Sequence, residues 1–103
     1  MSDYLVIYVT YPSEEEATSL CAHLLEQELI ACANIYPTQS MYRWKGKINN
    51  EKEWVSILKS TEQNWTKLQN ALNKLHSYDT PCITSWKATG SEQYSEWVHK
   101  NTK

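Results

Sequence analysis

The sequence predicts an α+β protein with the ferredoxin-like βαββαβ order and one further helix at its C-terminal end. Four segments rich in β-branched and aromatic residues predict strands, and two segments between them repeat apolar residues at helical spacing. The chain has 103 residues, of which 41% are hydrophobic. That length suits one small core, so we expect residues 1–103 to form a single domain.

The first part of the chain predicts a strand, a helix and a second strand. Residues 4–10 (YLVIYVT) form an almost uninterrupted apolar run, which is typical of a strand covered on both faces. Ser13 with a glutamate three residues later matches a capping box, and the apolar spacing then predicts a helix over residues 14–28. Residues 30–36 (IACANIY) predict the second strand, which we expect to stop or bend at Pro37.

The stretch SMYRWKGKIN (residues 40–49) predicts part of a hairpin. With a period of two residues, Tyr42 and Trp44 share one face. The other face is expected to carry three cations: Arg43, Lys45 and Lys47. Two consecutive asparagines, residues 49–50, supply turn chemistry, and residues 54–59 (WVSILK) predict the return strand.

The last part of the chain predicts a helix, a strand and a terminal helix. Residues 60–63 resemble a helix start, and an apolar stripe continues to about His76. The residues before Pro81 predict a loop, and residues 82–88 (CITSWKA) predict the last strand. A short helix then follows Gly90, with aromatic residues on one side.

Alternating aromatic and basic side chains in YRWKGK (residues 42–47) are also typical of surfaces that bind nucleic acid. The whole chain, however, has 12 acidic and 10 basic residues, which gives a formal net charge of −2. Dedicated nucleic-acid binders usually carry a basic excess. We therefore interpret the stretch as a strand with one packed and one solvated face, and expect no nucleic-acid partner.

Several classes of protein are disfavoured by what the sequence lacks. No apolar run approaches the roughly 20 residues of a membrane span, and the first four residues do not resemble a signal peptide. The three cysteines are odd in number and form no Cys-x-x-Cys pair, which indicates reduced thiols. There is no nucleophile elbow or phosphate loop. We expect a cytoplasmic protein with no membrane partner and no enzymatic activity.

Three motifs together resemble the CutA family of divalent-cation tolerance proteins. ACANIYPTQSMYRWKGKINNEKEWVSILKS (residues 31–60) follows the family pattern Ala-Cys-x-Asn, Pro, Ser-x-Tyr-x-Trp-x-Gly-Lys and a spaced Glu before Ile-x-Lys. LHSYDTP (residues 75–81) resembles its Leu-His-x-Tyr-x-x-Pro loop, and YSEW (residues 94–97) its Tyr-x-x-Trp. The resemblance implies a ferredoxin-like protomer in a compact homotrimer shaped like the PII signalling proteins. It also implies tolerance to copper and other divalent metal ions.

Cys32 and His76 are the candidate metal ligands. Cys32 stands at the family's Ala-Cys motif, and its sulfur suits copper or zinc. His76 follows a predicted helix, where a neutral imidazole could bind an ion. The alternatives are that Cys32 packs as a small hydrophobe and that His76 caps free helix carbonyls. The chain departs from the family pattern at four positions, Val9, Ser60, Ser77 and Cys82.

A second hypothesis is a PII-like signalling or scaffolding trimer. Such a protein would hold a small metabolite or a protein partner in the clefts between its subunits. Beside His76, the candidate cleft residues are Trp44, Glu53, Lys59, Tyr78 and Trp97.

Overall fold

The computed structural model describes residues 3–103, so Met1 and Ser2, which belong to the segment tested above for a signal peptide, lie outside the described residues. Its elements follow the order β1 (Asp3–Tyr11), α1 (Glu14–Glu26), β2 (Cys32–Trp44), β3 (Lys47–Ser60), a 3₁₀ turn (Glu62–Asn64), α2 (Trp65–Leu75), β4 (Ile83–Thr89) and α3 (Glu92–Lys100). The strands form one antiparallel sheet in the order β2-β3-β1-β4. The predicted ferredoxin-like α+β fold with a C-terminal helix is confirmed.

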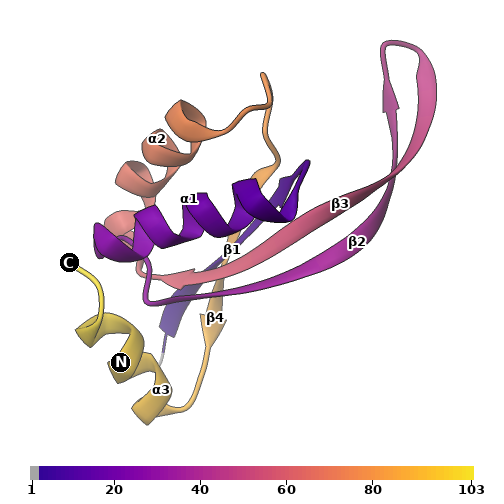
Figure 1. Ribbon diagram of the computed structural model, residues 1–103. Helices are drawn as coiled ribbons and strands as arrows, with labels where there is room; N and C mark the ends of the chain where they lie inside the picture. The colour runs from indigo at the N-terminus through magenta and orange to yellow at the C-terminus, as the bar shows by residue number, and fades with distance from the viewer. Residues whose placement is uncertain (1–2) are drawn as a thin grey trace.

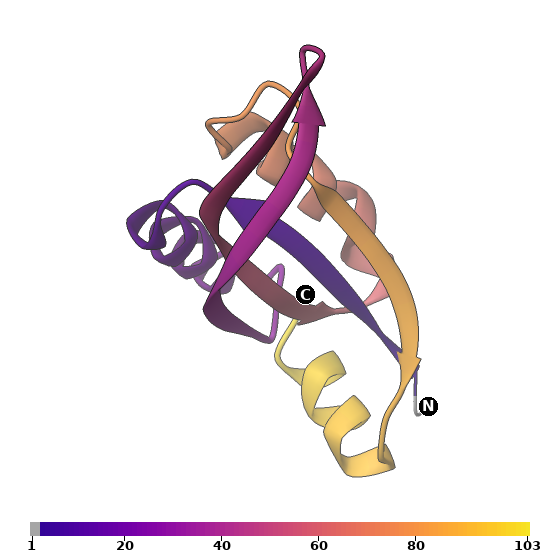
Figure 2. The ribbon, with the colours of Figure 1, turned by 90° about the vertical axis from the view of Figure 1, so that its right-hand side faces the viewer.

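The hydrophobic core lies between one face of the sheet and the helices α1 and α2, which cover that face (Figure 1). Alternate side chains of β1, from Leu5 to Tyr11, point into this layer and meet leucines of both helices. We call the opposite surface, which faces the viewer in Figure 2, the outer face. Helix α3 covers only one end of it, where the ring of Tyr94 packs edge-on against Tyr4 at a centroid distance of 5.4 Å.

Local signals in the sequence explain where the helices begin. The Ser13 hydroxyl accepts a hydrogen bond from the Glu16 amide at 3.1 Å, and Ser91 caps α3 in the same way through the Tyr94 amide at 3.2 Å. Helix α1 ends at Glu26, slightly earlier than predicted, and the chain then adopts a left-handed conformation at Glu28 with φ 58°. Within residues 3–103, no helix has the length and apolar character needed to cross a membrane.

The hairpin formed by β2 and β3 extends well beyond the rest of the sheet (Figures 1 and 2). Strand β1 pairs with β3 only from Trp54 to Ser60, so residues 38–44 and 47–53 pair only with each other. We call residues 38–53 the arm and residues 54–60 the body part of β3. At about 3.3 Å per residue, the arm projects about 23 Å, and it gives the chain dimensions of 44 × 23 × 21 Å.

The position of the hairpin turn corrects the sequence prediction. The turn consists of Lys45 and Gly46, with φ 50° and 76°, and both left-handed values are typical of a two-residue type I′ turn. Residues 49–50 therefore lie inside β3 and form no turn. Lys47 pairs with Trp44 across the hairpin, so the expected basic face over Arg43, Lys45 and Lys47 is wrong.

Strand β2 also continues through Pro37, where we expected it to stop or bend. Pro37 pairs with Trp54 of β3, and β2 is an edge strand of the sheet. A proline lacks the backbone N–H, but an edge strand has one side on which no ladder hydrogen bond is needed. The proline is therefore compatible with a strand of 13 residues at this edge.

Candidate functional site

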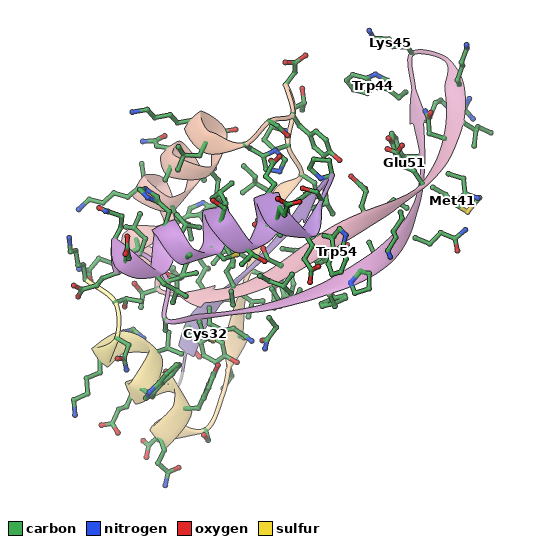
Figure 3. The ribbon with its side chains drawn as sticks, viewed as in Figure 1. Cys32, Met41, Trp44, Lys45, Glu51 and Trp54 are labelled. Atoms are coloured by element: carbon green, nitrogen blue, oxygen red, sulfur yellow. The ribbon has the colours of Figure 1, made fainter. Side chains whose placement is uncertain are left out.

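Cys32, the first candidate metal ligand, begins β2 at the end of the outer face that α3 covers (Figure 3). Its sulfur is partly buried and lies 3.4 Å from the Tyr94 hydroxyl. Burial, and then the hydrogen bond with Cys32, raise the pKa of Tyr94 to about 12, so this phenol stays protonated at neutral pH. Cys32 pairs across the sheet with Lys59, whose ammonium group donates a hydrogen bond to the Asn34 side chain.

His76, the second candidate ligand, is held by hydrogen bonds on both sides of its buried ring. Its Nε2 lies 2.7 Å from the Thr10 carbonyl oxygen, which can only accept, and its Nδ1 accepts from the Tyr78 amide at 3.1 Å. In this arrangement Nε2 is the donor to Thr10 and Nδ1 is the acceptor from Tyr78. The ring also stacks on Tyr11 at a centroid distance of 5.2 Å. A metal ion would have to replace one of these two hydrogen bonds.

Glu16 fastens the segment after α2 to the first helix. Its Oε2 accepts hydrogen bonds from the Ser77 amide at 3.1 Å and the Ser77 hydroxyl at 3.0 Å. The same oxygen lies 3.5 Å from His76 Nδ1. The loop that carries Tyr78 is therefore fixed from two sides, by Glu16 and by His76.

A single chain does not bring Cys32 and His76 together. Cys32 lies level with Val6 through the pairing of β2, β3 and β1, whereas His76 bonds to Thr10, four residues further along β1. That separation is about 13 Å along the strand alone. Among residues 3–103, no three His, Cys, Asp or Glu side chains form a group that could hold a metal ion. The two residues do not form a metal site within one protomer.

A pocket of about 760 Å³ lies on the outer face between the arm, β1 and the loop before β4. We call it the outer-face pocket. Figure 3 shows that Trp44 and Glu51 lie on the side of the arm that faces the body. The pocket is lined by Tyr8, Thr10, Thr38, Gln39, Ser40, Met41, Tyr42, Trp44, Glu53, Ser77, Tyr78, Asp79, Thr80 and Cys82.

Two phenol–carboxylate pairs organise this pocket. The Tyr78 hydroxyl donates to Glu53 Oε2 at 2.6 Å, and the Tyr42 hydroxyl donates to Glu51 at the pocket edge. Burial, and then the bond to Glu53, raise the pKa of Tyr78, while the bond to Glu51 is the main cause that raises the pKa of Tyr42 to about 12. Burial, with a smaller effect of Glu53, also raises the pKa of the Cys82 thiol. These hydroxyl and thiol groups are therefore neutral at neutral pH.

Three of the predicted cleft residues, Trp44, Glu53 and Tyr78, meet in the outer-face pocket. Lys59 lies at the other end of β3 beside Cys32, and Trp97 lines a separate depression on α3. Sequence reasoning placed Glu16 in a capping box with Ser13 but missed that its carboxylate bonds to Ser77, which is 61 positions away. It also missed Tyr8, Thr10 and Tyr42 as pocket residues. Tyr42 could have been found, because the sequence places it on the same strand face as Trp44, and both residues line the pocket.

The fold and the pocket together define a small ferredoxin-like protein with a projecting hairpin and a pocket beside it. The family described as "CutA1 divalent ion tolerance protein" matches residues 5–101 of this sequence. The chain belongs to the CutA family, as the motifs in the sequence predicted.

Individual relatives agree with this assignment. The divalent-cation tolerance protein CutA of Thermotoga maritima is 40% identical over 98 residues, which are 94% of this chain and 97% of that protein. The structure of the periplasmic divalent cation tolerance protein CutA from Archaeoglobus fulgidus has a TM-score of 0.94 and 34% identity, and the match covers 97% of this chain and 99% of that one. The chloroplastic protein CutA of Arabidopsis thaliana is 34% identical over 96% of this chain and 56% of its own length.

Proposed function

We propose that this protein acts in tolerance to divalent metal ions, as a cytoplasmic homotrimer that binds copper or another divalent cation without catalysing a reaction. The observation that carries this proposal is the family match over residues 5–101, supported by a relative named for divalent-cation tolerance that is matched over 97% of its length.

Cys32 is the ligand through which we expect a soft ion to bind. Its thiol is partly exposed, and sulfur is the preferred donor for copper and a good one for zinc. One chain supplies no complete ligand set around it, so the remaining ligands would come from a neighbouring copy. His76 stays the second candidate and would need to exchange its hydrogen bond with Tyr78 for the ion. Binding requires a thiolate and a neutral imidazole, so it should weaken on acidification.

Calorimetric titration with copper and zinc tests the role of Cys32. We expect Cys32→Ser to lower the affinity at least about tenfold, the effect of losing one good ligand bond. Cys82→Ser is the matched control, because it removes another thiol on the outer face and should leave the affinity unchanged. Equal metal affinities for the wild type and Cys32→Ser would remove Cys32 from the site.

Two features support the homotrimer: the exposed apolar side chains of the arm and the unpaired edges of the sheet. A two-stranded hairpin is at best marginally stable in water unless something packs against it. In the arm, however, Ile48 is 70% exposed and Trp44 is 51% exposed. The strands β2 and β4 are both sheet edges with no neighbour on one side in the single chain. Contact with further copies would cover these groups, and the number three is what the family resemblance implies.

Light scattering tests the assembly directly. We expect a mass near three times the chain mass of 12.1 kDa. Ile48→Asp, which places a charge at an exposed apolar position of the arm, should shift the protein toward single chains. Asn73→Asp on the exposed surface of α2 adds the same charge and should leave the mass unchanged. A wild-type protein that stays a single chain at micromolar concentration would contradict the proposal.

The alternative function, a PII-like signalling trimer that binds a small metabolite, is favoured by one specific observation. The outer-face pocket of about 760 Å³ is large enough for a metabolite and contains three of the predicted cleft residues. Mass spectrometry of the gently purified protein decides between the two functions, because a retained organic molecule favours signalling and a retained metal ion favours tolerance.

A further inference from the structure

A single side-chain hydrogen bond joins the arm to the rest of the chain in the part that the structure describes. It runs from the Tyr78 hydroxyl, in the loop before β4, to Oε2 of Glu53 at the base of the arm, over 2.6 Å. The other side-chain hydrogen bonds of the arm, such as the one from Tyr42 to Glu51, have both partners inside the arm. The arm therefore has one polar attachment to the body besides the continuation of its own strands.

The bond between Tyr78 and Glu53 is suited to hold the arm in one direction. Glu53 is only 7% exposed, and a hydrogen bond to a carboxylate is roughly twice as strong as one between neutral groups. Burial, and then the bond to Glu53, raise the pKa of Tyr78, so its hydroxyl keeps the hydrogen that it donates. Strand pairing holds the arm together but gives it no contact with β1 or β4. The bond to Tyr78 supplies such a link.

Tyr78 is itself fixed to β1 through His76. The Tyr78 amide donates to His76 Nδ1 at 3.1 Å, and the two rings lie at a centroid distance of 4.9 Å. The other ring nitrogen of His76 donates to the carbonyl oxygen of Thr10 in β1 at 2.7 Å. The His76 ring also stacks on Tyr11, the last residue of β1, at 5.2 Å. The position of Tyr78 is therefore set by the central part of the sheet.

The residue between His76 and Tyr78 is fixed to helix α1. Oε2 of Glu16 accepts hydrogen bonds from the amide and the hydroxyl of Ser77, at 3.1 and 3.0 Å. Glu16 lies in the first turn of α1, which the Ser13 hydroxyl caps through the Glu16 amide. The segment that reaches the arm is thus attached both to the sheet and to the helix layer.

We propose that residues 76–78 form a strut that sets the direction of the arm, by joining Glu53 at its base to β1 through His76 and to α1 through Glu16. The consequence for assembly rests on the homotrimer proposed above. A surface that already has its bound geometry loses less conformational freedom on association. The strut therefore prepares the arm for contact with other copies. The direction of the arm is a property of each chain and is measurable whatever the number of copies.

Residual dipolar couplings of the backbone amides, measured by NMR, test the direction of the arm relative to the body. Tyr78→Phe removes the hydroxyl, so we expect smaller couplings for the arm amides and unchanged couplings for the helices and the rest of the sheet. Tyr42→Phe is the matched control, because it also removes a phenol that bonds to a carboxylate, but both ends of that bond lie in the arm. Equal arm couplings in the wild type and Tyr78→Phe would overturn the proposal.

A second pair of variants tests the other end of the strut, and it replaces the first pair if Tyr78→Phe does not fold by circular dichroism. Glu16→Ala removes the carboxylate that holds Ser77. Glu15→Ala removes the same charge from the same first turn of α1 without removing either of these bonds. We expect only Glu16→Ala to reduce the arm couplings. Arm couplings equal to those of Glu15→Ala would show that the helix does not support the strut and would overturn the proposal.

Sedimentation equilibrium tests the consequence for assembly. We expect Tyr78→Phe to associate at least about tenfold more weakly than the wild type, the effect of one hydrogen bond to a charged group. Glu53→Gln should associate more tightly than Tyr78→Phe, because its amide oxygen still accepts from Tyr78. A mobile arm together with wild-type association in Tyr78→Phe would overturn the assembly role. A wild type that stays a single chain would refute the homotrimer and this role with it, but not the direction measured by the couplings.

Discussion

Strand β3 passes through two regions that differ in what covers them, although its pairing with β2 is continuous. The body part of β3 contains three fully buried residues, Val55, Ser56 and Leu58. In the arm, Ile48 is 70% exposed, and Glu53 at the base is the one buried residue of β3 between Lys47 and Glu53. The ladder with β2 continues through both regions, but only the body part of β3 also pairs with β1. Burial against other layers and a second paired strand therefore both distinguish the body part from the arm.

We expect the largest loss of stability when a buried side chain in the body part of β3 is shortened. Leu58→Ala removes a fully buried side chain from the core under α1 and α2, and such cavities cost about 3 kcal/mol of unfolding free energy. Lys47→Ala, at the exposed start of the same strand, should change it by less than about 0.5 kcal/mol. Urea unfolding of both variants measures the difference. Similar losses for both would show that the arm and the body are equally important for stability.

A second pair of variants compares buried and exposed tyrosines. The Tyr11 hydroxyl is buried 2.7 Å from the Ser56 hydroxyl, so Tyr11→Phe leaves a buried group without its partner and should cost about 1–2 kcal/mol. Tyr42→Phe removes an exposed hydrogen bond to Glu51 in the arm and should cost less than about 0.5 kcal/mol. Thermal melts at neutral pH check both values, and a larger loss for Tyr42→Phe would reverse the comparison.

The buried tyrosine also predicts a loss of stability at alkaline pH. Burial, the main cause, raises the pKa of Tyr11, so the folded chain holds this proton more tightly than the unfolded chain does. The contribution is therefore fully present below pH about 10, the ordinary tyrosine pKa, and is lost as the pH rises above it. Urea unfolding at several pH values above 9 should show a steeper decline for the wild type than for Tyr11→Phe. Parallel declines would remove Tyr11 as the cause.

The two glycines give a further comparison between the tip of the arm and the rest of the molecule. Gly46 has φ 76°, and within residues 3–103 no neighbouring atom lies within 4 Å of the position that a Cβ would occupy. Only backbone strain opposes a side chain there, so Gly46→Ala should cost about 1 kcal/mol. Gly90→Ala in the body is the contrasting variant, because its Cβ would lie 2.7 Å from the Tyr4 ring and force that ring to move. Thermal melts should rank the Gly90 variant as the less stable of the two.

Much of the fold follows from local signals that the sequence displays. The apolar run of residues 4–10 and the cap at Ser13 predicted β1 and the start of α1 nearly to the residue. The hairpin turn was misplaced because two asparagines resemble a turn more strongly than Lys45 followed by Gly46 does. A left-handed lysine is uncommon, and its conformation here is set by the strands on both sides of the turn.

The candidate site was only partly predictable, because its contacts join distant parts of the chain. Glu53 and Tyr78 were both named as cleft residues, and the structure joins them by a hydrogen bond across 25 positions. The hydrogen bond of His76 to Thr10 spans 66 positions and depends on how α2 packs against β1. Helical periodicity predicts which face of α2 packs against the sheet. It does not predict how far along the sheet the helix lies. The sequence therefore could not predict that both ring nitrogens of His76 form hydrogen bonds.

The elongated outline of the chain has a practical consequence for measurements of its size. A particle of 44 × 23 × 21 Å experiences more friction in solution than a sphere of equal mass. A lone chain would leave a gel-filtration column early and would imitate a heavier species. The number of copies should therefore be read from scattered intensity or sedimentation equilibrium, which respond to mass, and the elution volume should be used only to follow changes between variants.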